Sequence, residues 1–350
     1  MLDLEGAVTF LFRLVLWRDP NPDELRDYVD ALRTYRATPQ QLARGFILSD
    51  EFMALEPGAG GIARVEAMGC TFLLPEGFTV IHELQSSQGY EPWVLPYFLE
   101  HCRPGMTVLD IGASIGAYAL PAALRVTPTG RVFALEAGPM NCQLLARSAK
   151  ASNLANVHLL PFGASDTLGA AYMRRQGFTN NNEIASAESV NIDRLDFYDI
   201  VPVLPVDFLR PALGAVDIVK MDIEGMEYKA TLGFSALIRE CHPIVFCEYS
   251  PRFQKHGSGV EGAELLGLFL DMGYRIEILH RNRPRESVTP TNRHDAIEYV
   301  DRVWETHVRD DSGSHLDLCF HPVPGNRISN TERPQPSMLT RWFGRDRTSQ

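Results

Sequence analysis

Two acidic residues stand at the ends of two apolar runs that a glycine turn separates. The first run, 108–111, contains Asp110 and continues into a Gly-x-x-x-Gly turn, and the second, 131–135, is followed by Glu136. Glycines after a parallel strand let the backbone approach a nucleoside, and a carboxylate at the tip of the next strand can accept hydrogen bonds from both ribose hydroxyls. We therefore predict a nucleoside site in which Asp110 orients the turn and Glu136 holds the ribose.

The spacing of the glycines selects among nucleosides. A dinucleotide site uses G-x-G-x-x-G, whose middle glycine lets a pyrophosphate sit on the helix N-terminus. Ser114 occupies that middle position here, and no phosphate-cradling run follows. Gly112 and Gly116 are expected to leave room for a ligand without phosphates, such as S-adenosylmethionine. An NAD-dependent oxidoreductase on a related sheet is the alternative, which the missing glycine disfavours.

A second group of ionisable residues follows a later apolar run. Lys220, Asp222 and Glu224 occupy alternate positions, and on a strand over 216–222 they share one face. A buried face rarely tolerates three charges, whereas open parallel sheets bind ligands outside the carboxyl ends of their strands. The pattern therefore predicts the rim of a crevice. The alternative is a structural network at the start of a helix, whose N-terminus favours negative charge.

Other candidates stand at the ends of neighbouring predicted strands. Glu248 closes one apolar run, and Asp166 follows the third strand, where it could accept from the adenine amine or serve as a turn residue. His256, in a glycine-containing loop at 255–259, is a minor candidate for a proton acceptor. Five other histidines show no metal-ligand spacing: His242, His280, His294, His307 and His315.

Strand and helix patterns alternate from residue 105 onward, which predicts a parallel sheet with crossover helices. The predicted strands are 106–111, 131–136, 157–162, 216–222, 244–249, 274–279 and 316–321, preceded by a short strand at 70–75. The predicted helices are 116–126, 138–152, 226–240 and 260–272, preceded by one that opens at 90–93. The less regular segment 167–202 is expected to be an active-site loop.

The chain divides into four predicted parts. Residues 1–56 form a small helical domain, whose second helix Asp23 caps; 57–62 is a linker; 63–322 is the large α/β domain; and 323–350 is a disordered, Pro/Ser/Arg-rich tail.

The overall composition limits the class of protein. The formal net charge of -11 argues against a nucleic-acid partner. The six cysteines form no C-x-x-C pair, which fits buried thiols in a reducing compartment. No apolar run approaches the roughly 18 residues that span a bilayer, and the acidic N-terminus lacks the basic start of a signal peptide. We expect a cytoplasmic protein without a transmembrane segment.

Segment 63–321 resembles the FkbM-type methyltransferases. The residues that carry the resemblance are Tyr90-Glu91-Pro92, Val108 to Gly116, Phe133 to Glu136, Ala164-Ser165-Asp166, Val219 to Glu227 and Phe246-Cys247-Glu248. The K-x-D-x-E-G-x-E run at 220–227 is the most specific of them. Ser114 stands where the family commonly has Asn, and Ala137-Gly138-Pro139 replaces a more usual Glu-Pro-Asn-Pro-like run.

The resemblance implies an α/β fold: the Rossmann-like, seven-stranded S-adenosylmethionine-dependent methyltransferase fold with a small N-terminal all-α domain. The cofactor contacts that it implies come from Glu91, Asp110, Gly112, Ala113, Ser114, Gly116, Glu136, Ser165, Asp166 and Asp222. It also implies methyl transfer to a hydroxyl, on a saccharide or a secondary metabolite. The N-terminal unit resembles bacterial helical domains similar to phycobilisome linker domains, which suggests partner binding.

An alcohol is a poor nucleophile unless its proton leaves as the new bond forms, which calls for a base or a metal. We predict that Asp222 and Glu224, with Lys220 and Glu248 beside them, line the acceptor side of the pocket. Either of the first two carboxylates could take the proton or bind a divalent ion, and the sequence does not separate these roles. A non-catalytic scaffold that binds the cofactor is a further alternative.

Overall fold

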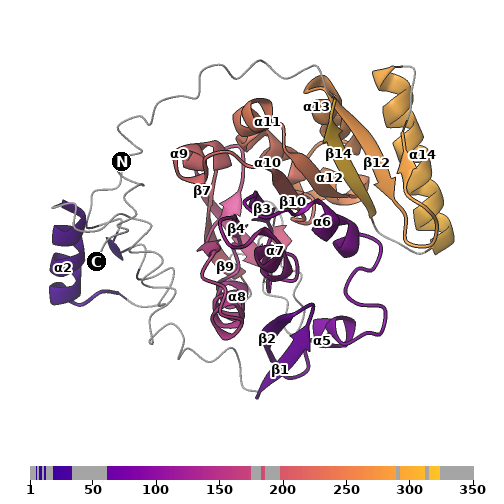
Figure 1. The fold of residues 1–350 in the computed structure, drawn as a ribbon. Helices are drawn as coiled ribbons and strands as arrows, with labels where there is room; N and C mark the ends of the chain where they lie inside the picture. Colours follow the sequence, from indigo (N-terminus) through magenta and orange to yellow (C-terminus); the bar gives the residue numbers. More distant parts are fainter. Residues whose placement is uncertain are drawn as a thin grey trace.

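The computed structural model describes residues 19–33, 61–174, 183–185, 198–288, 292–311 and 315–323, with four single residues before position 13. Its largest element is an eight-stranded sheet in the order β13-β12-β14-β11-β10-β3-β4-β5 (Figure 1). The strands are β3 (Thr107–Ile111), β4 (Arg131–Leu135), β5 (Val157–Leu160), β10 (Ile218–Met221), β11 (Ile244–Tyr249), β12 (Tyr274–Leu279), β13 (Glu286–Ser287) and β14 (Leu316–Pro322).

The predicted Rossmann-like sheet is confirmed. All seven predicted strands of the sheet are present, each within two residues of its predicted ends, and β13 adds a two-residue edge strand. Strands β5, β4, β3, β10 and β11 are parallel, whereas β14 runs antiparallel between β11 and β12. Every residue of β3 and β10 is buried, as expected for central strands covered on both faces.

Helices cover both faces of the sheet, and Figure 1 shows α11 and α13 above it and α6 and α7 below. The helices around the sheet are α6 (Leu95–His101), α7 (Ala119–Val126), α8 (Pro139–Ala151), α10 (Glu227–Gly233), α11 (Ser235–Cys241), α12 (Pro251–Gly257), α13 (Gly262–Asp271) and α14 (Arg293–Asp311). A short 3-10 turn and α9 (Arg210–Leu213) precede β10.

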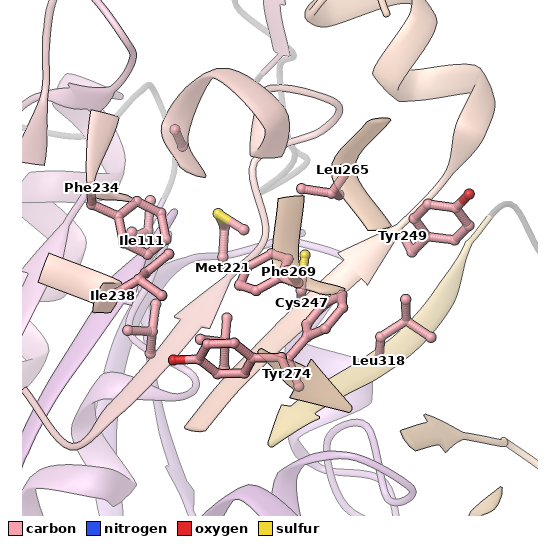
Figure 2. Close-up of a cluster of buried hydrophobic side chains, with 14 of the residues drawn as sticks. Ile111, Met221, Phe234, Ile238, Cys247, Tyr249, Leu265, Phe269, Tyr274 and Leu318 are labelled. Carbon is pink, nitrogen blue, oxygen red and sulfur yellow. The ribbon is translucent and has the colours of Figure 1, made fainter. Parts of the chain in front are cut away.

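Alternate residues of the strands feed two separate cores. On one face, Met221, Cys247 and Leu318 pack with Phe234 and Phe269, which come from the helical segments that cover this face, as Figure 2 shows. On the other face, which we call the α6 face, Val108, Ile218, Phe246 and Cys319 pack against α6 and α7. The strand period of two therefore places the next residues along these strands, Asp110, Lys220, Glu248 and Asp317, on the α6 face as well.

The prediction of an active-site loop at 167–202 is wrong for the part that is described. Strands β7 (Gly169–Arg174), β8 (Glu183–Ala185) and β9 (Tyr198–Leu204) join β6 (Gly163–Ala164) in a second, four-stranded sheet. This sheet packs Met173 and Val201 against Ala137, the residue just beyond Glu136. It therefore covers one side of the loop after β4.

The predicted short strand at 70–75 is confirmed as β2 (Cys70–Pro75). It pairs with β1 (Ile62–Ala67) in an antiparallel hairpin that, followed by α5 (Val80–Leu84), packs on α8. Neither β1 nor α5 was predicted, and several other elements also differ from the sequence prediction. The predicted helix 226–240 is broken at Phe234 into α10 and α11. His256, expected in a loop, lies exposed on α12. The long helix α14, which buries Ala296, Val300 and Trp304 in the core, was not among the predicted helices.

Only one helix of the predicted N-terminal domain is described, α2 (Pro22–Arg33). Its cap is Asn21 rather than the predicted Asp23, because the Asn21 Oδ1 accepts from the backbone N–H of Glu24 at 2.9 Å while the Glu24 carboxylate accepts from the Asn21 N–H at 2.8 Å. The linker prediction, 57–62, and the tail prediction, 323–350, fall almost wholly outside the described residues, so the predicted domain boundaries remain predictions.

A close approach of two strands depends on Gly112. Its φ of +82° lies in the left-handed region, and a Cβ at this position would come within 2.0 Å of the Asp222 carbonyl oxygen. The space beside Gly116 is likewise filled, by Leu120 and Leu145. The missing side chains of these glycines therefore make room for the protein itself, and their contact with a ligand stays a prediction.

Gly112→Ala should lower the free energy of unfolding by about 3 kcal/mol or more, because the cost of a left-handed backbone at alanine adds to the cost of the clash with the Asp222 carbonyl. Urea denaturation measures the loss. Gly169→Ala is the matched control, because no atom lies within 4 Å of a Cβ there, and it should change stability by less than about 0.5 kcal/mol. Equal stabilities of the two variants would contradict this account of Gly112.

Candidate active site

The predicted site residues converge on one edge of the sheet. The parallel strands β3, β4, β10 and β11 end there, and the antiparallel β14 begins there. In the registers, Lys220 lies beside Asp110, and Glu248 lies beside Asp317. The edge therefore carries a row of ionisable side chains on the α6 face, as expected for the carboxyl ends of an open parallel sheet.

Lys220 is the centre of this row. Its side chain is 2% exposed, its Nζ lies 3.1 Å from the Asp222 Oδ2, and it lies 4.8 Å from the centroid of the Tyr118 ring. Burial alone would lower the pKa of Lys220, but the negative charges of Asp222 and Glu91 outweigh it and raise the pKa. The ammonium group is therefore charged and paired.

The carboxyl groups around Lys220 carry different charges. Burial would raise the pKa of Asp222, but the Lys220 ammonium lowers it below its ordinary value, so Asp222 is ionised. Burial raises the pKa of Glu248 well above its ordinary value, and the charge of Asp222 adds to the effect. Burial therefore favours the protonated form of Glu248, and a hydrogen bond between Glu248 and Asp222 helps to lower the pKa of Asp222.

Glu91 joins the cluster from the segment before α6. The Tyr118 hydroxyl donates a hydrogen bond to the Glu91 Oε2. Burial is the main cause that raises the pKa of Glu91 to about 7, although the Lys220 charge acts in the opposite direction. The prediction of Glu91 comes from the resemblance to a family. The structure places Glu91 beside Lys220, which the sequence pattern singled out.

Sequence reasoning missed three residues of the cluster. His315 places its Nδ1 3.3 Å from the Glu248 Oε1 and its Nε2 3.9 Å from the Asp317 Oδ2, and the Trp93 indole N–H donates to Asp317 at 2.7 Å. Asp317 lies next to Glu248 only because β14 is antiparallel. In the sequence, the alternation of His315 and Asp317 at the start of the predicted strand 316–321 is the feature that could have indicated them.

Asp110 is buried at the end of β3, with 2% of its surface exposed. Within the described part of the chain, its Oδ2 has no hydrogen-bond partner. Burial raises the pKa of Asp110 to about 7, against the attraction of Lys220. A buried carboxylate oxygen without a partner is costly, and it marks a position where a donor from a ligand would be stabilised.

Glu136 fixes the turn that follows β3. Its carboxylate accepts from the backbone N–H of Ser114 at 2.7 Å and of Gly138 at 2.6 Å. Burial raises the pKa of Glu136, while these two N–H groups oppose the shift. The residue therefore ties together the two loops at the strand tips, a role that the sequence did not indicate, and its contact with a ribose stays a prediction.

The remaining predicted residues lie around this edge in different settings. The alternation of Lys220, Asp222 and Glu224 does not continue through one strand, because β10 ends at Met221 and Glu224 has a φ of +53° in the following turn. Glu227 closes that turn by accepting from the Ile223 N–H at 2.9 Å. Glu224 is thus half-buried on a turn rather than on the predicted strand face.

Ser165 and Asp166 lie just beyond β6, at the junction of the two sheets. The Ser165 hydroxyl donates to the Asp166 Oδ1 at 3.1 Å. Ser165 is buried and Asp166 is exposed. Ala113 is buried in the α6 core, and its backbone N–H donates to the Leu135 carbonyl at 2.8 Å.

Three predicted site residues adopt left-handed backbone conformations. They are Glu91 (φ +39°), Ser114 (φ +48°) and Glu224 (φ +53°), half of the six such non-glycine residues in the described chain. A side chain in this region costs about 1–3 kcal/mol, and such positions cluster at functional sites. Asn tolerates the conformation better than Ser, which gives a physical reason why Asn is common at the position of Ser114 in the family that the chain resembles.

No metal centre is indicated at this edge. Among the described residues, the set of three metal-ligating side chains whose ligand atoms lie within 4.8 Å of one another is Glu277, Cys319 and His321. The carboxylates around Lys220 are not part of it. The sequence prediction of a divalent ion near Asp222 therefore gains no support.

Comparisons with known proteins agree with the fold. The strand order and the site at the carboxyl edge define a Rossmann-like methyltransferase fold. Residues 110–276, slightly less than half of the chain, match the family model of the methyltransferase FkbM domain. The match includes most of the residues described above, from Asp110 through Glu248.

Individual relatives are distant. A probable cobalt-precorrin-6B C(15)-methyltransferase (decarboxylating) from Sulfolobus acidocaldarius is 25% identical over 138 residues, which are 39% of this chain and 66% of that protein. The chain thus spans just under two thirds of this curated relative.

Two solved structures are also similar. One is a methyltransferase FkbM from Methylobacillus flagellatus KT, with 18% identity, a TM-score of 0.37, and 71% of this chain and 56% of that chain covered. The other is an Aeropyrum pernix fibrillarin in complex with S-adenosyl-L-methionine, with 11% identity, a TM-score of 0.36, and 63% of this chain and 68% of that chain covered.

The described residues contain no helix long and apolar enough to cross a membrane.

Lys220→Met should destabilise the protein by about 3–5 kcal/mol, because it leaves buried carboxylates without their counter-charge. These carboxylates then bind protons more tightly in the folded state, so the loss should grow as the pH rises from about 5 to about 8. Urea denaturation at both pH values measures it. Lys150→Met, on the exposed last turn of α8, is the control, and a Lys220 variant as stable as this control would contradict the proposed charge balance.

Proposed function

We propose that this protein transfers a methyl group from S-adenosylmethionine to a hydroxyl group of a small-molecule acceptor. The observation that carries the proposal is the meeting, at one edge of the sheet, of the 112–116 turn with a cluster of carboxyl groups around Lys220. The first feature suits a nucleoside. The second suits proton transfer from an alcohol.

The charge of the edge favours this cofactor over a dinucleotide. Asp110, Asp222 and Glu91 surround the single buried ammonium group of Lys220, which is already paired at 3.1 Å. A pyrophosphate would meet these carboxyl groups and a lysine that is already paired, whereas a sulfonium and an α-amino group are positive. The partnerless Oδ2 of Asp110 offers an acceptor for such an amino group.

The other cofactor contacts follow from the strand tips. Glu136, which the N–H groups of Ser114 and Gly138 hold at the strand tip, would hold the ribose. Ser165 and Asp166, beside the loop after β4, would meet the adenine, and the second sheet would cover that end. Gly112, Ala113, Ser114 and Gly116 would form the wall of the site with their backbone.

When bound, S-adenosylmethionine supplies an electrophilic methyl group, and the chain must hold an acceptor oxygen in line with it. Asp222 is the ionised carboxylate of the cluster and would accept the hydroxyl proton at Oδ1 or Oδ2. Lys220 keeps it ionised and oriented, and Glu248 is hydrogen-bonded to it. Glu224, on the adjacent turn, is the second candidate for the proton.

The substrate class and the setting remain part of the proposal. We infer a saccharide or secondary-metabolite hydroxyl as the acceptor, which makes the protein an O-methyltransferase, and a cytoplasmic location. The net charge of -11 supports a partner other than nucleic acid. The N-terminal segment, which resembles phycobilisome-linker-like domains, would bind a partner protein. A cofactor-binding scaffold without turnover is the competing function.

Calorimetry with S-adenosylhomocysteine and with NAD tests the cofactor. We expect binding of the first and none of the second. Glu136→Ala should raise the dissociation constant by about tenfold or more, equivalent to about 1.4 kcal/mol. Glu66→Ala, which removes an exposed acid on β1, should leave it unchanged. Preferential binding of NAD would refute the proposal.

Asp222→Asn should lower turnover by at least about 100-fold, since general-base catalysis contributes about 10²–10⁴-fold. Transfer of tritium from labelled S-adenosylmethionine to a panel of mono- and oligosaccharides measures it, with calorimetry to confirm that S-adenosylhomocysteine still binds. Asp217→Asn is the matched control, because Asp217 holds the Thr107 N–H at 2.8 Å at the opposite end of β10. Full turnover in the Asp222 variant would remove this residue from the mechanism.

A further inference from the structure

A row of potential metal ligands lies along one face of β14. His315, Asp317, Cys319 and His321 occupy alternate positions, and the residues between them, such as Leu318 and Phe320, belong to the opposite core. The first two residues of the row take part in the cluster around Lys220. Cys319 and His321 lie deeper on the α6 face, and the proposed function uses neither.

The neighbouring strand β12 adds a third ligand to this pair. Glu277 is the direct partner of Cys319 in the antiparallel register of β12 and β14. One ligand atom from each of Glu277, Cys319 and His321 lies within 4.8 Å of the others. Cys319 is 0% exposed and His321 is 8% exposed, so the three atoms meet inside the protein rather than on an acidic surface.

A ring of contacts holds these side chains in place. The His321 Nε2 lies 2.9 Å from the Glu277 Oε2, and the Tyr97 hydroxyl donates to the same oxygen at 2.7 Å. Carboxylates that ligate metals are themselves held by hydrogen bonds in this way. The three ligand atoms are therefore positioned by two strands and by α6.

His101, at the end of α6, faces the same cluster. Its ring centroid lies 5.9 Å from that of His321, and its Nδ1 lies 2.9 Å from the Tyr97 carbonyl oxygen. Donation from Nδ1–H to a backbone carbonyl leaves Nε2 with a lone pair, which is the usual arrangement of a metal-ligating histidine. His101 therefore stands next to the group, whose three ligand atoms come from Glu277, Cys319 and His321.

We propose that Glu277, Cys319 and His321 bind a zinc-type divalent ion. One thiolate, one imidazole and one carboxylate are ligands that Zn²⁺ accepts in tetrahedral geometry, with water in the fourth position. Binding forms a Zn–S bond and releases the Cys319 thiol proton to solvent. The ion joins β12 to β14 and has no part in methyl transfer, so the proposal stands apart from the proposed function.

The test uses the untagged full-length protein after treatment with a chelator. Calorimetry with Zn²⁺ should show one strong site, and Co²⁺ should produce the near-ultraviolet absorption band of a cobalt–thiolate bond. Cys319→Ser should abolish the band, and His321→Gln should weaken Zn²⁺ binding by more than about 100-fold, beyond the range of about 10–100-fold typical of residues that only support ligands.

Two controls separate ligation from packing. His280→Gln removes another buried histidine that contacts a glutamate, with its Nε2 3.1 Å from the Glu286 Oε2, and Cys102→Ser removes another buried thiol of the α6 face. Both should leave Zn²⁺ affinity unchanged. Absence of the cobalt–thiolate band in the unaltered protein would overturn the proposal even if the variants failed to fold, because Tyr97, Glu277 and His321 would then form a hydrogen-bond network only.

Discussion

The buried ammonium group of Lys220 is the interaction on which the rest of the site depends. A lysine that is 2% exposed loses most of its hydration, and only nearby negative charge keeps it protonated. The acids need the lysine equally, since several carboxyl groups at one sheet edge repel one another when ionised. The result is an uneven distribution of charge: Lys220 lowers the pKa of Asp222, whereas burial raises the pKa of Glu248 behind it. Asp222 is therefore the carboxylate of this pair that is held in the form able to accept a proton.

The two cores explain why this charge lies where it does. One face of the sheet is apolar along the whole length of its central strands, whereas the α6 face is apolar only up to the level of Val108, Ile218 and Phe246. Beyond that level, the same face carries ionisable residues. Left-handed residues in the adjoining loops, such as Ser114 and Glu224, are held by packing and by acids such as Glu136 and Glu227 that accept from loop N–H groups.

The antiparallel strand β14 extends this arrangement across the sheet. Because it starts where the parallel strands end, its first residues enter the site, and its later residues line the deeper part of the α6 face. One strand with alternating polar residues thus serves two places: His315 and Asp317 at the edge, and Cys319 and His321 in the proposed metal site.

The sequence by itself determined seven strands of the large sheet, their mostly parallel arrangement and the acids at the strand tips, because apolar runs of fixed length and the glycine spacing are local properties. It also singled out Lys220 and Asp222, since charges inside an apolar run conflict with burial unless they are functional. It could not determine which face α6 covers, that β14 pairs with β11, or that Glu136 accepts from the turn at Ser114. These depend on contacts between residues far apart in the chain. Only the tertiary structure therefore decided which residues surround Lys220, that His315 lies beside Glu248, and that Glu277 pairs with Cys319.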